Sequence, residues 1–214
     1  MGTANAVLLS QHNEVICYDL NSNRIDQINK KISPIEDEEA SKFLLSSNLN
    51  IRGVTKFPSS EDFNFVVIAT PTNYDPKTNN FDTSSIQDCI GQLNNVGSKA
   101  TIIIRSTLPI GFVKSMKKKF PSQEIIFVPE FLREGRALHD SIHPSRIVIG
   151  SHSKNAKIFA DLLVQGAVDK NVKVLFTNSD EAETSKLFAN SYLAMRVAFF
   201  NELDTFAMSK NLNS

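Results

Sequence analysis

Short runs of consecutive apolar residues alternate along most of the chain with segments in which apolar positions recur every three or four residues. The runs predict strands that are buried on both faces, and the periodic segments predict helices. We expect strands at 14–20, 65–69, 101–104, 124–128, 146–149 and 172–176, and helices at 2–10, 21–30, 37–46, 84–93, 109–120 and 156–164. This alternation is typical of a doubly wound α/β sheet.

From about residue 181 to residue 210 the pattern changes to that of one long helix. The segment has no glycine or proline, and its apolar residues recur at helical spacing: Leu187, Phe188, Tyr192, Leu193, Val197, Phe200, Leu203 and Phe206. Such a helix is too long for a crossover connection and predicts a link to a second domain or a partner chain. We therefore expect an α/β domain over 1–178, and a long helix over 179–214 that begins a second domain.

Composition and charge exclude several classes of protein. Hydrophobic residues make up 41% and charged residues 21% of the chain, and 23 basic residues balance 23 acidic ones. The absence of a basic excess argues against a nucleic-acid partner. Two cysteines, Cys17 and Cys89, are too few for a disulfide scaffold. Without an apolar run of spanning length or a signal peptide, we expect a cytoplasmic protein with no membrane partner.

The eight glycines are the feature that conflicts with a dinucleotide-binding sheet. No two of them are separated by a single residue, so the chain contains no complete P-loop or G-x-G-x-x-G loop. Asp19 nevertheless ends the second-strand pattern, seventeen residues after Gly2. An acid in that place binds the ribose hydroxyls of a dinucleotide, so Gly2 could be the last glycine of a loop that begins outside this chain. The alternative is that Asp19 caps a helix.

Two strand ends carry residues suited to a bound ligand. The sequence Ala-Thr-Pro-Thr at 69–72 allows a flat ligand to approach the backbone, although a plain turn would look the same. Ser106 and Thr107 follow the strand at 101–104 and could contact a ligand or cap the next helix.

Charged residues at two further places could carry chemistry. Glu130 and Glu134 follow a buried strand and would share a face if the segment were helical. A carboxylate beside a cofactor could act as a general base, whereas the alternative is a charged loop. Lys186 and Asn190 have the same spacing on the long helix and could bind an alkoxide oxygen, or could simply be exposed. The four histidines show no spacing that we interpret as a metal site, so no metal is expected.

Seven strings in this order resemble the UDP-glucose 6-dehydrogenase family of nucleotide-sugar dehydrogenases over nearly the whole chain: ANAVLLSQHNEVICYD, KISPIEDEE, VVIATPTNYD, STLPIGF, VPEFLREGRAL, PSRIVIG and KLFANSYLAMRVAFFNELDTFA. The family oxidises UDP-glucose to UDP-glucuronate in two NAD-dependent steps, through a thiohemiacetal and a thioester on a cysteine. For the complete protein, the resemblance implies NAD and UDP-glucose as ligands. It also implies a Rossmann-like NAD-binding domain over 1–178, and a middle, dimerisation domain that begins with the long helix at 179–214.

The resemblance also implies roles for particular residues. On the cofactor side, Asp19 and Arg24 would lie at the adenosine ribose, and Gly2 would close the phosphate loop. Thr72 and Thr107 would contact the nicotinamide half of NAD or a catalytic water. Glu134 would lie beside NAD. On the substrate side, Glu130 would be the base for the water that cleaves the thioester. The pocket would be lined by Phe131, Leu132 and Arg133, and the oxyanion at C6 would be stabilised by Lys186 and Asn190.

The chain departs from the family pattern at both ends. The strand and most of the glycine loop that precede ANAVLL are absent, and so is the cysteine segment that follows the long helix. We therefore expect a fragment whose sheet lacks its first strand and which is inactive alone. The alternatives are a non-catalytic remnant that at most dimerises through its long helix, a UDP-mannosaminuronate-type dehydrogenase, or an NAD-dependent hydroxyacid dehydrogenase.

Overall fold

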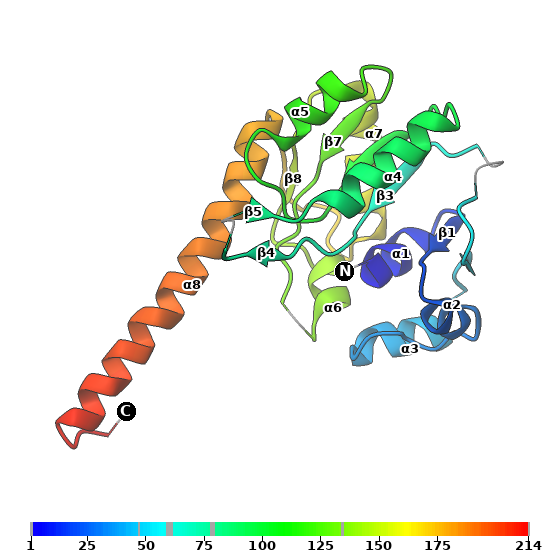
Figure 1. Cartoon of the computed structure of the whole chain (residues 1–214). Coiled ribbons are helices and arrows are strands. Elements are labelled where there is room, and N and C mark those ends of the chain that lie inside the picture. Colours follow the sequence, from blue (N-terminus) through cyan, green and yellow to red (C-terminus); the bar gives the residue numbers. More distant parts are fainter. Residues whose placement is uncertain (1, 47, 59–61, 78–79, 134, 214) are drawn as a thin grey trace.

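Parallel strands form the centre of the protein in the computed structural model, which describes residues 2–46, 48–58, 62–77, 80–133 and 135–213 (Figure 1). The central sheet has the order β3-β6-β7, made of β3 (Phe65–Ile68), β6 (Thr101–Ile104) and β7 (Ile125–Phe127). Strand β8 (Ile147–Ile149) pairs with β9 (Val174–Phe176). The N–H of Gly150 donates to the carbonyl oxygen of Phe127 at 2.8 Å, which ties β8 to β7.

Helices cover both faces of the central sheet. On one face Ile103 and Ile126 pack into a core with residues of α1 (Gly2–Ser10), α3 (Glu38–Ser46), α6 (Ala137–Ile142) and α7 (Lys154–Gly166). On the other face Ile102 and Ile125 pack against α4 (Ser84–Asn95) and α5 (Phe112–Lys119). Neighbouring residues of one strand thus enter opposite cores, and the predicted α/β class with helices on both faces is confirmed.

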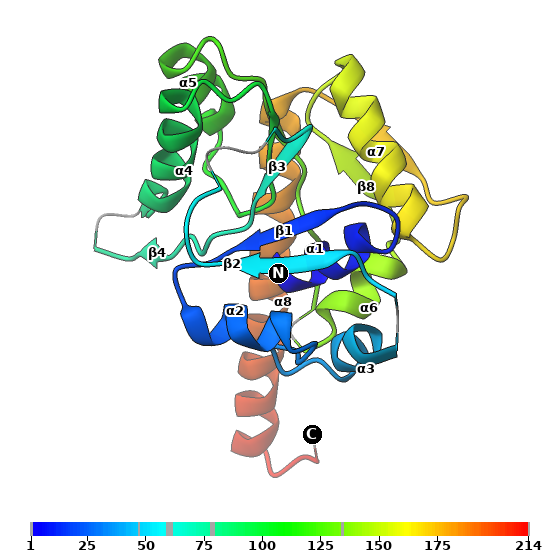
Figure 2. The same cartoon turned by 90° about the vertical axis from the view of Figure 1, so that its right-hand side faces the viewer.

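Strands β1 and β3 lie in separate sheets. Among the described residues, β1 (Val15–Tyr18) pairs with β2 (Ile51–Val54), and β3 pairs with β6. Figure 2 shows β1 and β2 as a pair set apart from β3, with α2 (Ser22–Asn29) beside them. All of β1 and most of β3 are half-buried, whereas all of β6 is buried. Each of the two strands therefore keeps one edge that the described strands do not cover.

Helix α8 (Ser179–Ser209) packs against the domain only through its beginning and then projects away from it (Figure 1). Glu183, near its start, is fully buried and accepts hydrogen bonds from the N–H groups of Gly111 at 2.6 Å and Val113 at 2.9 Å. It thereby caps α5 from another helix. None of the described helices combines the length and the apolar character that crossing a bilayer requires.

The sequence-based prediction misses four short elements. These are β2, the hairpin of β4 (Tyr74–Asp75) and β5 (Asn80–Phe81), and α6. They are two to six residues long, which is too short to show a period. The helix expected from residue 109 begins at Phe112, because Gly111 adopts φ +86°, a left-handed conformation that a helix cannot include.

Candidate active site at the carboxyl edge of the sheet

The carboxyl ends of β3 and β6 meet, as neighbouring parallel strands require. The Ser106 hydroxyl donates to the carbonyl oxygen of Thr70 at 2.6 Å. Thr72 and Thr107, in the loops that follow these strands, are both half-buried. The first residue of α1 lies at the same edge, since a Cβ placed on Gly2 would be 3.7 Å from the Cβ of Ala69. The N-terminal end of α1 therefore lies at this edge, where the positive end of the helix dipole would stabilise an anion.

Asp19 follows β1 and presents a partly exposed carboxylate. It accepts a hydrogen bond from the N–H of Asn21 at 2.8 Å and lies 3.5 Å from Nη1 of Arg24. The cap of α2 is Asn21, whose side chain accepts from the N–H groups of Asn23 and Arg24. The helix-cap role weighed for Asp19 thus belongs to Asn21, and the Asp19 carboxylate, 37% exposed, remains accessible to a ligand.

Glu130 lies at the centre of a buried polar cluster at the end of β7. Its Oε1 accepts a hydrogen bond from Nε of Arg105 at 2.6 Å and a second one from the side-chain amide of Asn5. Its Oε2 is buried and has no hydrogen-bond partner among the described residues. The Lys186 ammonium group donates to the backbone oxygen of Glu130 at 2.5 Å. With Glu130 only 2% exposed, the alternative of a charged surface loop does not hold for this residue.

Two members of this cluster are not among the residues that the sequence singled out. Arg105 directly follows a strand of four buried residues and is itself 7% exposed. A buried guanidinium requires an anionic partner. A charged residue directly after an apolar run was therefore the signal in the sequence that could have identified Arg105. Asn5 shows no such signal, because a small polar residue in a helix is unremarkable.

The described residues between β7 and α6 form an irregular loop rather than a helix. Glu130 therefore lies in a loop, and Glu134, the other member of the predicted pair, lies outside the described residues. Arg133 binds the carboxylate of Asp140 through Nε at 3.0 Å and Nη2 at 2.6 Å. This guanidinium is the main reason why the pKa of Asp140 is lowered. The ion pair fixes the loop to α6.

A cavity of about 310 Å³ opens beside this loop. Glu130, Phe131, Leu132 and Arg133 all line it, together with Arg105 and Arg146. The Phe131 ring contacts two cations, with Cζ of Arg146 at 4.4 Å and Nζ of Lys186 at 5.5 Å from its centroid. Arg105 and Arg133 are each paired with a carboxylate that also lines the cavity, Glu130 and Asp140. With Arg146 the lining keeps a small positive excess, which favours an anionic ligand such as a phosphate.

Lys186 and Asn190 differ in their surroundings. Burial lowers the pKa of Lys186, and the negative charge of Glu130 opposes this effect. Asn190 lies one turn further along α8 and is exposed. Among the described residues, Lys186 is thus the member of this predicted pair that is hydrogen-bonded to the Glu130 cluster.

Neither cysteine is activated as a nucleophile. Burial raises the pKa of the Cys17 thiol to about 11, and it also raises the pKa of Cys89. A catalytic cysteine needs the opposite shift, toward the thiolate.

The sheet, the helix N-terminus at its carboxyl edge and the acid after β1 together define a dinucleotide-binding α/β domain. The chain belongs to the UDP-glucose/GDP-mannose dehydrogenase family, because the model of that family's NAD binding domain matches residues 1–167.

Curated relatives are similar over the full chain. A UDP-glucose 6-dehydrogenase of Campylobacter jejuni is 46% identical over 217 residues, which cover 100% of this chain and 55% of that protein. A UDP-glucose 6-dehydrogenase of Streptococcus pneumoniae is 44% identical and is covered to 56%. The chain thus spans about half the length of these relatives.

Solved structures share the fold at lower identity. A UDP-D-ManNAc dehydrogenase from Pyrococcus horikoshii superposes with a TM-score of 0.84 at 23% identity, over 99% of this chain and 53% of that one. A GDP-mannose dehydrogenase from Pseudomonas aeruginosa gives a TM-score of 0.83 at 23% identity, over 99% and 52%.

Proposed function

We propose that this chain is the NAD-binding part of a UDP-glucose 6-dehydrogenase, which oxidises UDP-glucose to UDP-glucuronate. The observation that carries the proposal is the 46% identity to such an enzyme over the whole chain. The buried Glu130 cluster beside a cavity with a small excess of positive charge supports it, because a nucleotide sugar carries a diphosphate.

The cofactor would lie along the carboxyl edge of the sheet. Asp19 would accept hydrogen bonds from the adenosine ribose, with Arg24 beside it, and the N–H groups at Gly2 would face the pyrophosphate. Thr72 and Thr107 would lie at the nicotinamide half, and Glu134 stays a prediction without structural support. NAD, when bound, accepts the hydrides that leave the sugar.

A parallel strand would lie between β1 and β3 in the complete protein. Both strands keep an edge that the described strands do not cover, and α1 begins where a strand between them would end. Such a strand would lead through a glycine-rich loop into α1 at Gly2 and give the order expected of this sheet. It would also satisfy the backbone groups of both edges.

Reaction at C6 would involve Glu130 and Lys186. Glu130 lines the cavity, and its Oε2, which has no hydrogen-bond partner among the described residues, could accept a proton from the water that attacks the thioester. The Lys186 ammonium, with Asn190, would stabilise negative charge on the C6 oxygen. Phe131, Leu132 and Arg133 would hold the sugar nucleotide. Because both thiols of this chain have raised pKa values, we propose that the reacting cysteine lies elsewhere in the complete protein.

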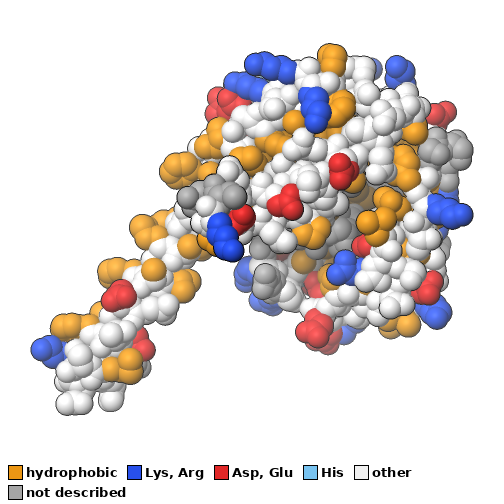
Figure 3. Space-filling view, in the orientation of Figure 1, with side chains coloured by type: hydrophobic (Ala, Val, Ile, Leu, Met, Phe, Trp, Pro, Cys, Tyr) orange, Lys and Arg blue, Asp and Glu red, His pale blue; other side chains and the backbone are white. Residues whose placement is uncertain are grey.

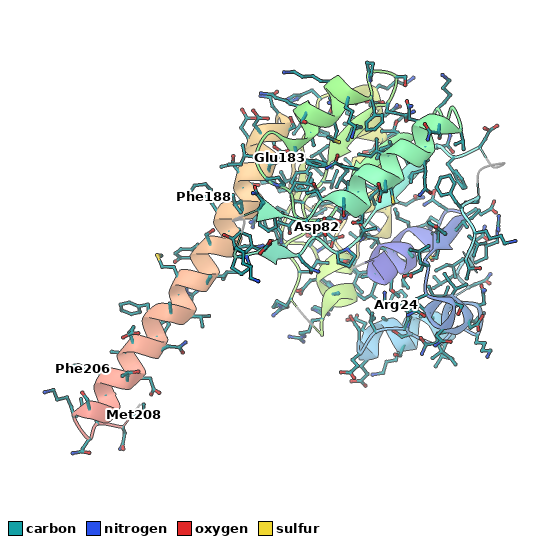
Figure 4. All side chains as sticks on the ribbon, viewed as in Figure 1. Arg24, Asp82, Glu183, Phe188, Phe206 and Met208 are labelled. Carbon is teal, nitrogen blue, oxygen red and sulfur yellow. The ribbon has the colours of Figure 1, made fainter. Side chains whose placement is uncertain are left out.

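Helix α8 would begin a second domain, so that the two units are residues 1–178 and 179–214. Figure 3 shows hydrophobic side chains along the projecting helix, and Figure 4 shows Phe188, Phe206 and Met208 extending from it, in contrast to Glu183 at its base. Phe188 is 64% and Phe206 55% exposed. We propose that further chain or a second copy covers this surface.

Two alternatives remain as proposals. One is a dehydrogenase of another nucleotide sugar, which the similarity in fold to the UDP-D-ManNAc dehydrogenase favours. The other is a non-catalytic remnant, for which the edges of β1 and β3 are the supporting observation.

Binding of NAD tests the cofactor site. We expect Asp19→Ala to weaken NAD binding about 10–100-fold, because a hydrogen bond to a charged group contributes about 1.5–3 kcal/mol. Isothermal titration calorimetry measures the affinity, and Asp26→Ala, an exposed acid on α2, is the matched control. Tight binding that Asp19→Ala leaves unchanged would remove Asp19 from the site.

Turnover tests whether this chain acts alone. We expect no NADH, followed by absorbance, when the purified 214-residue chain is mixed with NAD and UDP-glucose, because neither of its thiols is activated. Steady turnover would refute the claim. NADH formation only with a different nucleotide sugar would instead favour the first alternative.

A further inference from the structure

Three side chains with metal-ligating atoms meet where α3 and α6 touch. These are Glu39, His139 and His143, and one ligating atom from each lies within 4.8 Å of the others. Nδ1 of His139 is 3.0 Å from Oε2 of Glu39, and the two imidazole rings are 4.7 Å apart between centroids. The two histidines are four residues apart in sequence, which places them on one side of a helical turn. This spacing is visible in the sequence, whereas the carboxylate that completes the cluster comes from a residue 100 positions away from His139.

A buried carboxylate holds the two helices together at this point. Asp37 is 5% exposed, and its Oδ1 accepts a hydrogen bond from the N–H of Ala40 at 3.0 Å. Its Oδ2 accepts one from the N–H of Leu138, also at 3.0 Å. Asp37 therefore caps the start of α3 and binds the first turn of α6 at once. This contact brings Glu39 and His139 side by side, because each lies close to it on its own helix.

We propose that Glu39, His139 and His143 bind a zinc ion or a closely related transition-metal ion. Two imidazoles and one carboxylate form a ligand set that zinc accepts with a water as the fourth ligand. In a tetrahedral site with bonds of about 2.0–2.1 Å, the ligating atoms are roughly 3.3 Å apart. The cluster would have to close by about 1.5 Å at most, and the exposed side chain of His143 can rotate to do so.

The alternative is a plain ion pair between His139 and Glu39. An ion pair engages two of the three groups, and the second imidazole, which the helical spacing places beside the first, takes no part in it. A bound ion would engage all three groups and link α3 to α6. It would also lie at the rim of the cavity described above, since His143 lines that cavity. The inference does not depend on the proposed reaction, because no residue of the cluster takes part in it.

Zinc binding to the full chain tests the site directly. Protein without a histidine tag is treated with EDTA, dialysed and titrated with zinc chloride by calorimetry. We expect one ion per chain and a melting temperature that rises with zinc. Glu39→Gln and His143→Ala should each weaken the affinity at least tenfold, since substitutions even beyond the direct ligands cost roughly 10–100-fold. Magnesium should bind far more weakly, because it prefers oxygen ligands.

His12→Ala is the matched control, because His12 is an exposed histidine outside the cluster. It should leave the zinc affinity unchanged. Failure of the wild-type chain to bind zinc saturably would overturn the proposal, and so would an affinity that His143→Ala does not change. Circular dichroism of each variant shows whether it is folded. If His143→Ala is not, His143→Gln keeps a polar side chain of similar size and is interpreted in the same way.

Discussion

Glu130→Ala is expected to lower the free energy of unfolding by about 3–5 kcal/mol, because it leaves a buried cation without its partner. Arg105 is 7% exposed, and its Nε lies 2.6 Å from the Glu130 carboxylate. The substitution also removes the acceptor of the Asn5 side-chain amide. Since the total stability of a domain is only about 5–15 kcal/mol, a loss of this size should be visible in the melting temperature and in urea unfolding.

Arg133→Ala is the control for Glu130→Ala, because it also breaks an arginine–carboxylate pair. The side chain of Arg133 is 62% exposed, and Asp140, 12% exposed, keeps its hydrogen bond from the backbone N–H of residue 133 after the substitution. The cost should therefore be well below that of Glu130→Ala. Replacing both Arg105 and Glu130 by leucine should cost less than the sum of the two single leucine substitutions, because no charge is left unpaired. Equal effects of Glu130→Ala and Arg133→Ala would show that burial of the first pair does not matter.

Glu183→Ala is expected to lower the free energy of unfolding by about 2–4 kcal/mol. The fully buried carboxylate accepts hydrogen bonds from Gly111 and Val113 at the start of α5, and it joins this helix to α8. Alanine would leave both N–H groups without an acceptor. Urea unfolding measures the change, and Glu202→Ala, at an exposed position of the same helix, should have almost no effect. A loss below about 1 kcal/mol would contradict the capping role.

The effect of Glu183 should also depend on pH. Burial raises the pKa of its carboxyl group above 4.5, and the two backbone N–H groups only partly oppose this rise. An acid whose pKa is higher in the folded state than in the unfolded state makes its full contribution to stability at pH values below the unfolded-state pKa. That contribution is lost as the pH rises through the folded-state pKa. The Glu183→Gln variant has no titrating carboxyl group at this position. The stability of the wild type relative to Glu183→Gln should therefore fall as the pH rises from about 4, and a constant difference would contradict the assignment.

The sequence predicted the elements whose residues form a regular pattern. The strand at 101–104 follows from an apolar run, and the helix that begins at residue 84 follows from apolar positions that recur every three or four residues. The short β2 and the hairpin of β4 and β5 were missed, because two to four residues contain no period. The position and spacing of charged residues supplied Glu130 and Lys186 as candidates, the resemblance to a family gave them roles, and the fold then placed them in contact.

By itself, the sequence determined the alternation of strands and helices, the α/β class and the family, since these depend on local periodicity and on strings of residues. Only the tertiary structure decided which side chains meet. Asn5 and Glu130 are 125 residues apart in the chain, and Glu39 and His139 are 100 apart. Contacts between distant residues depend on how the helices pack against the sheet. No local pattern of residues encodes that packing.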